Sequence, residues 1–275
     1  MFKKLMHFFG IDSFFQGAYS IWDFFMSSTA ALLGTSPDKY APDAYKYVTK
    51  DIYPYLLGAG IALTNMFLLI GFIRQTSNFK ETMTLEAVVS LLVRFSVSNG
   101  LLYVGIPIMN NIISAGQEMS TYFLDKEDLP NVVTKEMDLG SFLLNALLFG
   151  IIFEIVALCC GCTILLTVFQ RYLSLYLLMG MYPVAVSTLA GGERISDTFY
   201  GWLKTFIGEV FKIVVIALVL QLAGKMVANL NFINNGGLDD IFDGALAGIV
   251  SMVQMIAVTG AVKGVDSLMR KMFAL

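Results

Sequence analysis

Charged side chains and histidine are scarce in this sequence. Asp, Glu, Lys and Arg together make up 14% of its 275 residues, against roughly 25% in a typical soluble domain. The only histidine is His7, which argues against a soluble enzyme that relies on histidine for metal binding or acid–base chemistry. The formal net charge of −3 provides no global basic surface of the kind that binds nucleic acid through its phosphates.

Cysteine is rare as well, and its three occurrences are confined to one apolar run, as Cys159, Cys160 and Cys162. An odd number in a single run defines no disulfide framework. Cys159 and Cys162 lie one helical turn apart, but zinc sites usually have four ligands, and the sequence offers no second pair and no histidine nearby. We therefore expect no metal site here and interpret these residues as small side chains at a close helix contact.

The signatures of common enzyme classes are missing too. The sequence contains no H-E-x-x-H, G-x-S-x-G, G-x-x-x-x-G-K-[ST] or Rossmann glycine motif. We therefore expect neither an enzyme nor a bound cofactor. An intramembrane enzyme of unfamiliar type would need two converging polar catalytic residues, and the sequence nominates no such pair.

Long apolar runs dominate the rest of the chain. Hydrophobic residues make up 57% of the sequence, and about 20 consecutive apolar residues cross a bilayer as a helix. Five such runs predict transmembrane helices at roughly 53–73, 85–106, 139–168, 205–228 and 245–262. The expected fold class is all-α, a polytopic membrane helix bundle over residues 52–275.

Residues 1–51 are expected to form an amphipathic helix followed by a linker. One face of the helix carries a polar stripe, made of Asp12, Gln16, Ser20, Asp23 and Ser27. The opposite face is apolar and consists of Phe8, Ile11, Phe15, Ala18, Trp22 and Phe25. Such a helix can lie in the membrane interface or pack on the rest of the protein, and the sequence leaves both possibilities open.

The distribution of basic residues predicts the orientation in the membrane. Most lysines and arginines near the spans fall in segments that the positive-inside rule places on the cytoplasmic side, namely Arg74, Lys80, Arg171, Arg194, Lys204, Lys263, Arg270 and Lys271. The segments 107–138 and 229–244 are acidic and are expected to face outward. These assignments predict a multi-pass membrane protein with a cytoplasmic C-terminus.

The segment 172–190 is apolar, yet Arg171 and Arg194 flank it on the same predicted side. A segment that begins and ends on one side cannot cross once, so we expect it to dip into the membrane and return. Pro183 would break the helix near the turn, and Gly191 and Gly192 would let the chain turn before the next span. The alternative is a complete sixth span.

Four charged residues within the predicted spans are candidates for function, because a charge in the membrane is costly unless it is paired or faces water. Glu154 is either a carboxyl bonded to a neighbouring helix or a pore-facing or proton-handling group. Arg94 could be its partner, although nothing in the sequence places the two in contact. Glu209 and Lys212 are three residues apart, share a helical face and are expected to pair.

Two segments resemble the TrbL-like polytopic inner-membrane subunits of conjugative type IV secretion systems. They read RYLSLYLLMGMYPVAVSTLAGGE and DTFYGWLKTFIGEVFKIVVIALVLQLAG, and the closing VTGAVKGVDSLMRKM is similar to the last helix of that family. The family shows an R-[YF]-x-x-[IL]-Y entry and a P-[IV]-x-x-S-T-x-A-G turn. The matching positions are Arg171, Tyr172, Tyr176, Pro183, Ser187, Thr188, Ala190 and Gly191, with Gly192 next in the chain. The short cytoplasmic tail resembles compact members from Gram-positive conjugative elements.

The resemblance implies a membrane channel or scaffold subunit that supports transfer of a DNA–relaxase substrate across the bacterial cytoplasmic membrane. It implies contacts with cytoplasmic ATPases and other envelope subunits, allows transient contact with the DNA–relaxase substrate, and supplies no catalytic residue. Five spans are too few to enclose a wide channel, so we expect a homo-oligomer surrounded by membrane lipid. The alternative is a small-solute secondary transporter in which Pro183 marks a discontinuous binding helix and Glu154 is the coupling carboxylate.

Overall fold

The computed structural model describes residues 11–77, 85–124, 143–228 and 246–273. Outside these ranges lie His7, Lys80, residues 125–138 of the predicted outward segment 107–138 and all of the acidic segment 229–244. The described residues are almost entirely helical and contain no strand. This result confirms the predicted all-α class.

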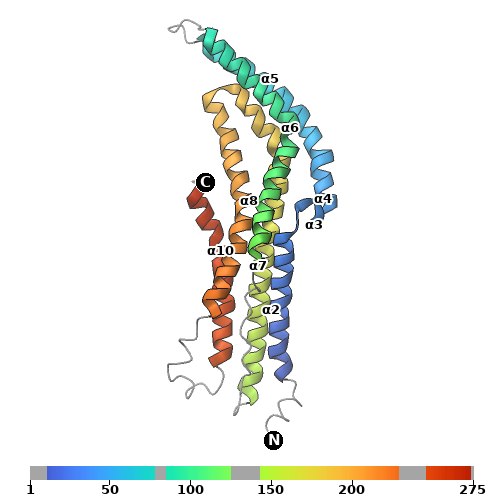
Figure 1. Cartoon of the computed structure of the whole chain (residues 1–275), viewed down its shortest axis with the longest axis vertical. Coiled ribbons are helices and arrows are strands. Elements are labelled where there is room, and N and C mark those ends of the chain that lie inside the picture. The colour runs from blue at the N-terminus through green and yellow to red at the C-terminus, as the bar shows by residue number, and fades with distance from the viewer. Residues whose placement is uncertain (1–10, 78–84, 125–142, 229–245, 274–275) are drawn as a thin grey trace. The chain divides into compact units, whose positions relative to one another are not determined.

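Five of the helices are long and apolar enough to cross a membrane (Figure 1). They are α5 (Tyr53–Ser77), α6 (Leu85–Leu124), α7 (Leu143–Ser187), α8 (Glu193–Ala228) and α10 (Leu246–Phe273). The described chain begins with α2 (Ile11–Gly34). The short helices α3 (Pro37–Tyr40) and α4 (Pro42–Lys46) and a π-helical turn, η1 (Tyr47–Ile52), lead from α2 into α5. The protein is therefore a polytopic helical protein with five candidate membrane spans.

The chain divides into two compact units, which are described separately. Unit 1 comprises Met1–Gly34, Glu118–Gln170 and Ile213–Leu268. Unit 2 comprises Thr35–Gln117, Arg171–Lys212 and Met269–Leu275. Four long helices, α6, α7, α8 and α10, contribute residues to both units.

In unit 1, α2 buries the apolar face that its sequence predicts. Ala18, Trp22 and Phe25 are buried, whereas Gln16, Ser20, Asp23 and Ser27 on the polar stripe are exposed. The Tyr19 ring packs edge-on against Phe153 of α7, with 5.2 Å between the ring centroids. Its hydroxyl lies 3.4 Å from Ser251 Oγ of α10. The apolar face of α2 thus packs on other helices of the unit.

The predicted break at Pro183 is wrong, because α7 runs without interruption from Leu143 to Ser187 with Pro183 inside it. Residues 143–168 of the predicted third span and residues 172–187 of the following segment lie in one helix of 45 residues, about 67 Å long at ~1.5 Å per residue. A hydrocarbon core is about 30 Å thick, so part of α7 extends beyond it. The chain turns at η2 (Thr188–Gly191) and at Gly192, which has a φ of 89°.

A continuous α7 also removes the need for the predicted dip. If α7 crosses the membrane and the chain turns at Gly192 into α8, Arg194 lies next to that turn, whereas Arg171 lies 16 residues before the end of α7, about 24 Å away at ~1.5 Å per residue. Pro183 removes only one backbone N–H near the end of the helix. The carbonyl that loses its partner to this proline is that of Met179, four residues back, and one such loss leaves α7 continuous. Close by, Trp202 Nε1 of α8 donates a hydrogen bond to the Leu178 carbonyl at 3.1 Å.

Candidate functional site

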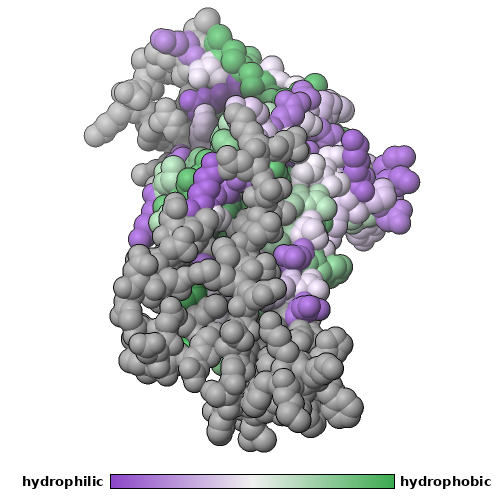
Figure 2. Space-filling model, turned by 60° about the horizontal axis from the view of Figure 1, so that its bottom comes forward, coloured by the Kyte–Doolittle hydropathy of each residue, from purple (hydrophilic) through white to green (hydrophobic). Residues whose placement is uncertain are grey.

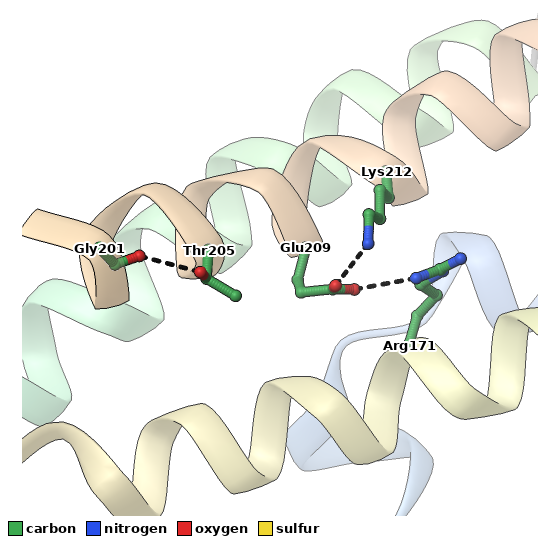
Figure 3. Close-up of polar contacts among 5 residues, drawn as sticks. All are labelled: Arg171, Gly201, Thr205, Glu209 and Lys212. Carbon is green, nitrogen blue, oxygen red and sulfur yellow. Dashed lines mark hydrogen bonds and ion pairs between the residues drawn. The ribbon is translucent and has the colours of Figure 1, made fainter. Parts of the chain in front are cut away.

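The most concentrated buried charge in unit 2 is an ion cluster between α7 and α8 (Figure 3). Arg171 Nη1 lies 3.2 Å from Glu209 Oε2, and Lys212 Nζ lies 2.5 Å from Glu209 Oε1. All three residues are buried, with exposed fractions of 6% for Arg171, 8% for Glu209 and 4% for Lys212. One carboxylate therefore bridges two cationic side chains out of contact with solvent.

The sequence spacing predicts one half of this cluster and misses the other. Glu209 and Lys212 form the i,i+3 ion pair expected on one helical face. The sequence pattern indicates Arg171 only as a motif residue and a cytoplasmic charge. Arg171 and Glu209 lie at similar distances along the chain on either side of the turn at Gly192, so a helical hairpin centred there would have indicated the contact.

Burial makes this cluster important for how α7 and α8 are held together. Hydrogen bonds between charged groups are shorter and stronger than neutral ones. Taking two charges out of water can cost as much free energy as their mutual attraction provides. Removing one partner, however, leaves a buried charge without its counter-ion. The cluster therefore fixes the register of the two helices more than it increases total stability.

The two motif tyrosines hold the connection that follows α2. The Tyr172 hydroxyl donates to the Thr35 carbonyl at 2.7 Å, and the Tyr176 hydroxyl donates to the Pro37 carbonyl at 2.7 Å. Gln117 Nε2 of α6 donates to the same Thr35 carbonyl at 3.1 Å. Tyr172 and Tyr176 are one turn apart on α7, so the R-Y-x-x-x-Y pattern presents both hydroxyls to one stretch of backbone.

The serine and threonine of the motif cap the C-terminal end of α7. The last carbonyls of a helix lack backbone partners within it. Ser187 Oγ donates to the Val184 carbonyl at 2.7 Å and Thr188 Oγ1 donates to the Ala185 carbonyl at 2.7 Å. Ser98 Oγ of α6 donates to the Val186 carbonyl at 2.9 Å. Three hydroxyls thus satisfy three successive carbonyls just before the turn.

The end of α7 also makes a close contact with α5. A Cβ added at Gly60 would lie 2.8 Å from the carbonyl oxygen of Pro183, whereas one added at Gly58 would meet nothing within 4 Å. Glycine at position 60 lets two backbones approach closely, as small residues commonly do between membrane helices.

Replacing Gly60 by alanine should destabilise the protein, and replacing Gly58 by alanine should not. The backbone carbonyl at Pro183 cannot rotate away, so the added methyl group must separate α5 from α7, at a cost of about 1–3 kcal/mol. Alanine at the open position 58 should gain roughly 0.5–1 kcal/mol from helix propensity. The thermal midpoints of both variants in the same detergent test this contrast. Equal midpoints would contradict the close contact.

Four aromatic residues pack beside this end of α7 in a cluster that the sequence analysis did not identify. Tyr182 lies edge-on to Trp202, with centroids 5.1 Å apart, and Trp202 stacks on Phe206 at 5.2 Å. Tyr53 stacks with Tyr182 at 6.4 Å. Hydrophobicity alone gives no signal for such a cluster, because the four residues come from three different helices.

Both tyrosines of this cluster are anchored to the backbone of α6. The Tyr53 hydroxyl donates to the Leu102 carbonyl at 2.7 Å, and the Tyr182 hydroxyl donates to the Leu101 carbonyl at 3.0 Å. These carbonyls lie just before Pro107, which is inside α6. The two rings reach α6 beside Gly105, where a side chain would collide with them.

Arg94 and Glu154, proposed above as conceivable partners, lie in different units. Glu154 is half-buried in unit 1, and its Oε1 lies over α2, where a Cβ added at Gly17 would be 2.5 Å away. Arg94 is half-buried in unit 2 and lines a cavity near the end of α7. The suggested pairing of the two residues stays a prediction.

Within the described residues, no group of three or more His, Cys, Asp or Glu side chains is placed to hold a metal ion. The cysteines are reduced, with Cys159 and Cys162 exposed and Cys160 buried.

The geometry of unit 2 is that of helices cross-linked by side-chain hydrogen bonds, ring stacking and a buried ion cluster.

These observations define the class as a polytopic α-helical protein with five candidate membrane spans. Comparison with family models, with curated proteins and with solved structures finds no match to this chain.

Proposed function

We propose that this chain is a channel or scaffold subunit of a conjugative type IV secretion system. In this role it resides in the bacterial cytoplasmic membrane and supports transfer of a DNA–relaxase substrate. The proposal assigns no catalytic step to the chain. It rests on the resemblance of residues 171–192 to TrbL-like subunits, together with what the side chains of that segment contact.

The observation that carries the proposal is that the motif side chains connect helices within unit 2. Arg171 bridges to α8, and Tyr172 and Tyr176 hold the backbone at residues 35 and 37. Ser187 and Thr188 cap the end of α7. A segment whose polar groups serve packing in this way suits a scaffold better than an enzyme.

Large exposed hydrophobic side chains support contact with lipid and with further copies of the chain. Tyr55, Leu69 and Ile73 of α5 have exposed fractions of 82%, 62% and 62%. Figure 2 shows hydrophobic residues at the surface beside hydrophilic ones on the face drawn. Exposed hydrophobic side chains on a candidate membrane span are suited to contact lipid or a further copy of the chain. A homo-oligomer would supply the walls of a conduit that five helices cannot enclose.

Co-purification from a conjugating donor strain tests the proposal at the level of partners. A tagged copy of the full chain, extracted in mild detergent, should recover the cytoplasmic ATPases and other envelope subunits of the system, together with a differently tagged second copy. The control is the same extraction from cells with the untagged chain. Recovery of folded, tagged chain with none of the secretion subunits would contradict the proposal.

The transporter alternative makes a different prediction at Glu154. Replacing Glu154 by glutamine should abolish solute uptake if this carboxyl couples ion and solute movement, because glutamine cannot carry the proton or charge. In the secretion role the same change alters DNA transfer or assembly and leaves solute uptake unchanged. Uptake by vesicles and transfer by donor cells, measured on the same variant, separate the two functions.

A further inference from the structure

A cavity of about 400 Å³ opens in unit 2 where α6, η2 and the first turns of α8 meet. This volume falls within the range of ~300–1,000 Å³ that is usual for small-molecule sites. Its polar lining comes from Arg94 of α6 and from Ser196, Asp197 and Tyr200 of α8, and its aliphatic lining includes Val97 and Leu189. The cavity thus combines a cation, an anion and hydroxyl groups with an apolar wall.

A ligand that carries both signs would complement the two charged groups of the lining. A guanidinium such as that of Arg94 pairs well with the oxygens of a phosphate, since its planar fork matches their geometry. A carboxylate such as that of Asp197 pairs with an ammonium group through charge-assisted hydrogen bonds. The Ser196 and Tyr200 hydroxyls can add neutral hydrogen bonds to the same ligand.

The apolar wall and the position of the cavity indicate that the ligand continues into the membrane. Arg94 lies in the first third of α6, and Asp197 lies in the first turns of α8. Both helix beginnings are on the side that the positive charges predict to be cytoplasmic. Tyrosine is common at the level of lipid headgroups, and Tyr200 is 53% exposed at the cavity rim. Val97 and Leu189 would face the glycerol and the first acyl carbons.

We propose that this cavity binds the headgroup of phosphatidylethanolamine from the cytoplasmic leaflet. Arg94 holds the phosphodiester, Asp197 accepts hydrogen bonds from the primary ammonium, and the aliphatic wall packs against the lipid backbone. Phosphatidylglycerol has no cation for Asp197, and the quaternary ammonium of phosphatidylcholine has no N–H to donate. This inference goes beyond the secretion role and does not rest on it.

Native mass spectrometry of the full chain, purified in detergent and titrated with each of the three lipids, tests this site. We expect phosphatidylethanolamine to bind up to about fivefold more tightly than the other two, the ratio given by an ion pair at an exposed carboxylate. Replacing Asp197 by asparagine should remove the preference over phosphatidylglycerol. Replacing Arg94 by glutamine should weaken binding of both phosphatidylethanolamine and phosphatidylglycerol.

Matched controls keep this experiment decisive. Asp43 and Arg74 are exposed and do not line the cavity, so Asp43→Asn and Arg74→Gln should bind the three lipids as the wild type does. Asp197 is exposed, so its variant should fold normally, which its thermal midpoint checks. Equal binding of the three lipids, or an unchanged preference in Asp197→Asn, would overturn the proposal. Binding of soluble glycerophosphoethanolamine as tight as that of the lipid would overturn the assignment to a membrane lipid.

Discussion

Replacing Glu209 by alanine should lower the free energy of unfolding by about 3–5 kcal/mol, the usual cost of removing one partner from a buried ion pair. Glu209 is the carboxylate that both Arg171 and Lys212 contact, and all three are buried. The variant would leave two cations in the interior without this counter-ion. We also expect α7 and α8 to lose their fixed register, since Arg171 and Glu209 bridge them.

Unfolding in mixed micelles with increasing SDS measures this loss. Thr205 provides the matched control, because it lies one turn before Glu209 on α8 and its hydroxyl donates to the Gly201 carbonyl of the same helix at 2.9 Å (Figure 3). Thr205→Ala should change stability by no more than about 0.5 kcal/mol. A Glu209→Ala variant as stable as Thr205→Ala would show that the cluster does not hold the helices.

Replacing Gly105 by alanine should produce the second large effect. The added Cβ would lie 2.1 Å from Tyr182 Cε1 and 2.6 Å from the Tyr53 hydroxyl oxygen. Both tyrosines are anchored by hydrogen bonds to α6 and stack on each other, so neither ring can move aside without losing a bond. Overpacking of this kind costs about 1–3 kcal/mol and sometimes more.

Gly100 lies on the same helix and provides a control, because replacing it by alanine should not lower the stability. A Cβ added there would meet nothing within 4 Å, so Gly100→Ala should be neutral or stabilising by roughly 0.5–1 kcal/mol. The thermal midpoint of Gly105→Ala should therefore fall, and that of Gly100→Ala should stay the same or rise. A Gly105→Ala variant with a wild-type midpoint would mean that the aromatic cluster is not packed as described.

Hydropathy predicts where the five apolar runs lie but not where their helices end. The fourth predicted span begins at residue 205, yet α8 begins at Glu193. The second was expected to end near residue 106, yet α6 continues through Pro107 to Leu124. Hydropathy reports a preference for the membrane, whereas a helix can continue through polar residues that tertiary contacts support. Gln117, bonded to the Thr35 carbonyl, is one such residue.

Pro183 was misjudged for a related reason. A proline inside a helix removes one backbone hydrogen bond, here that of the Met179 carbonyl, and membrane helices tolerate such a loss where neighbouring helices support them. Near Pro183, Ser98 of α6 donates to the Val186 carbonyl and Trp202 of α8 donates to the Leu178 carbonyl. Both donors come from other helices, and no local pattern in the sequence reveals them.

The polar contacts of the candidate site were predictable only where they are local. The Glu209–Lys212 pair follows from helical spacing, because neighbours one turn apart share a face. The contacts of Arg171, Tyr172 and Tyr176 join residues 38, 137 and 139 positions apart. A helical hairpin centred at Gly192 would indicate the Arg171–Glu209 contact, but the contacts of Tyr172 and Tyr176 depend on how distant helices pack, which no local pattern in the sequence reveals.

The frequency of conjugative transfer from a donor strain that lacks only this gene tests the central claim most directly. We expect transfer to be lost, to return with a wild-type copy supplied in trans, and to return poorly with the Glu209→Ala copy in proportion to its lower stability. Transfer at the wild-type frequency from the deletion strain would contradict the secretion role and would leave the transporter as the function to test.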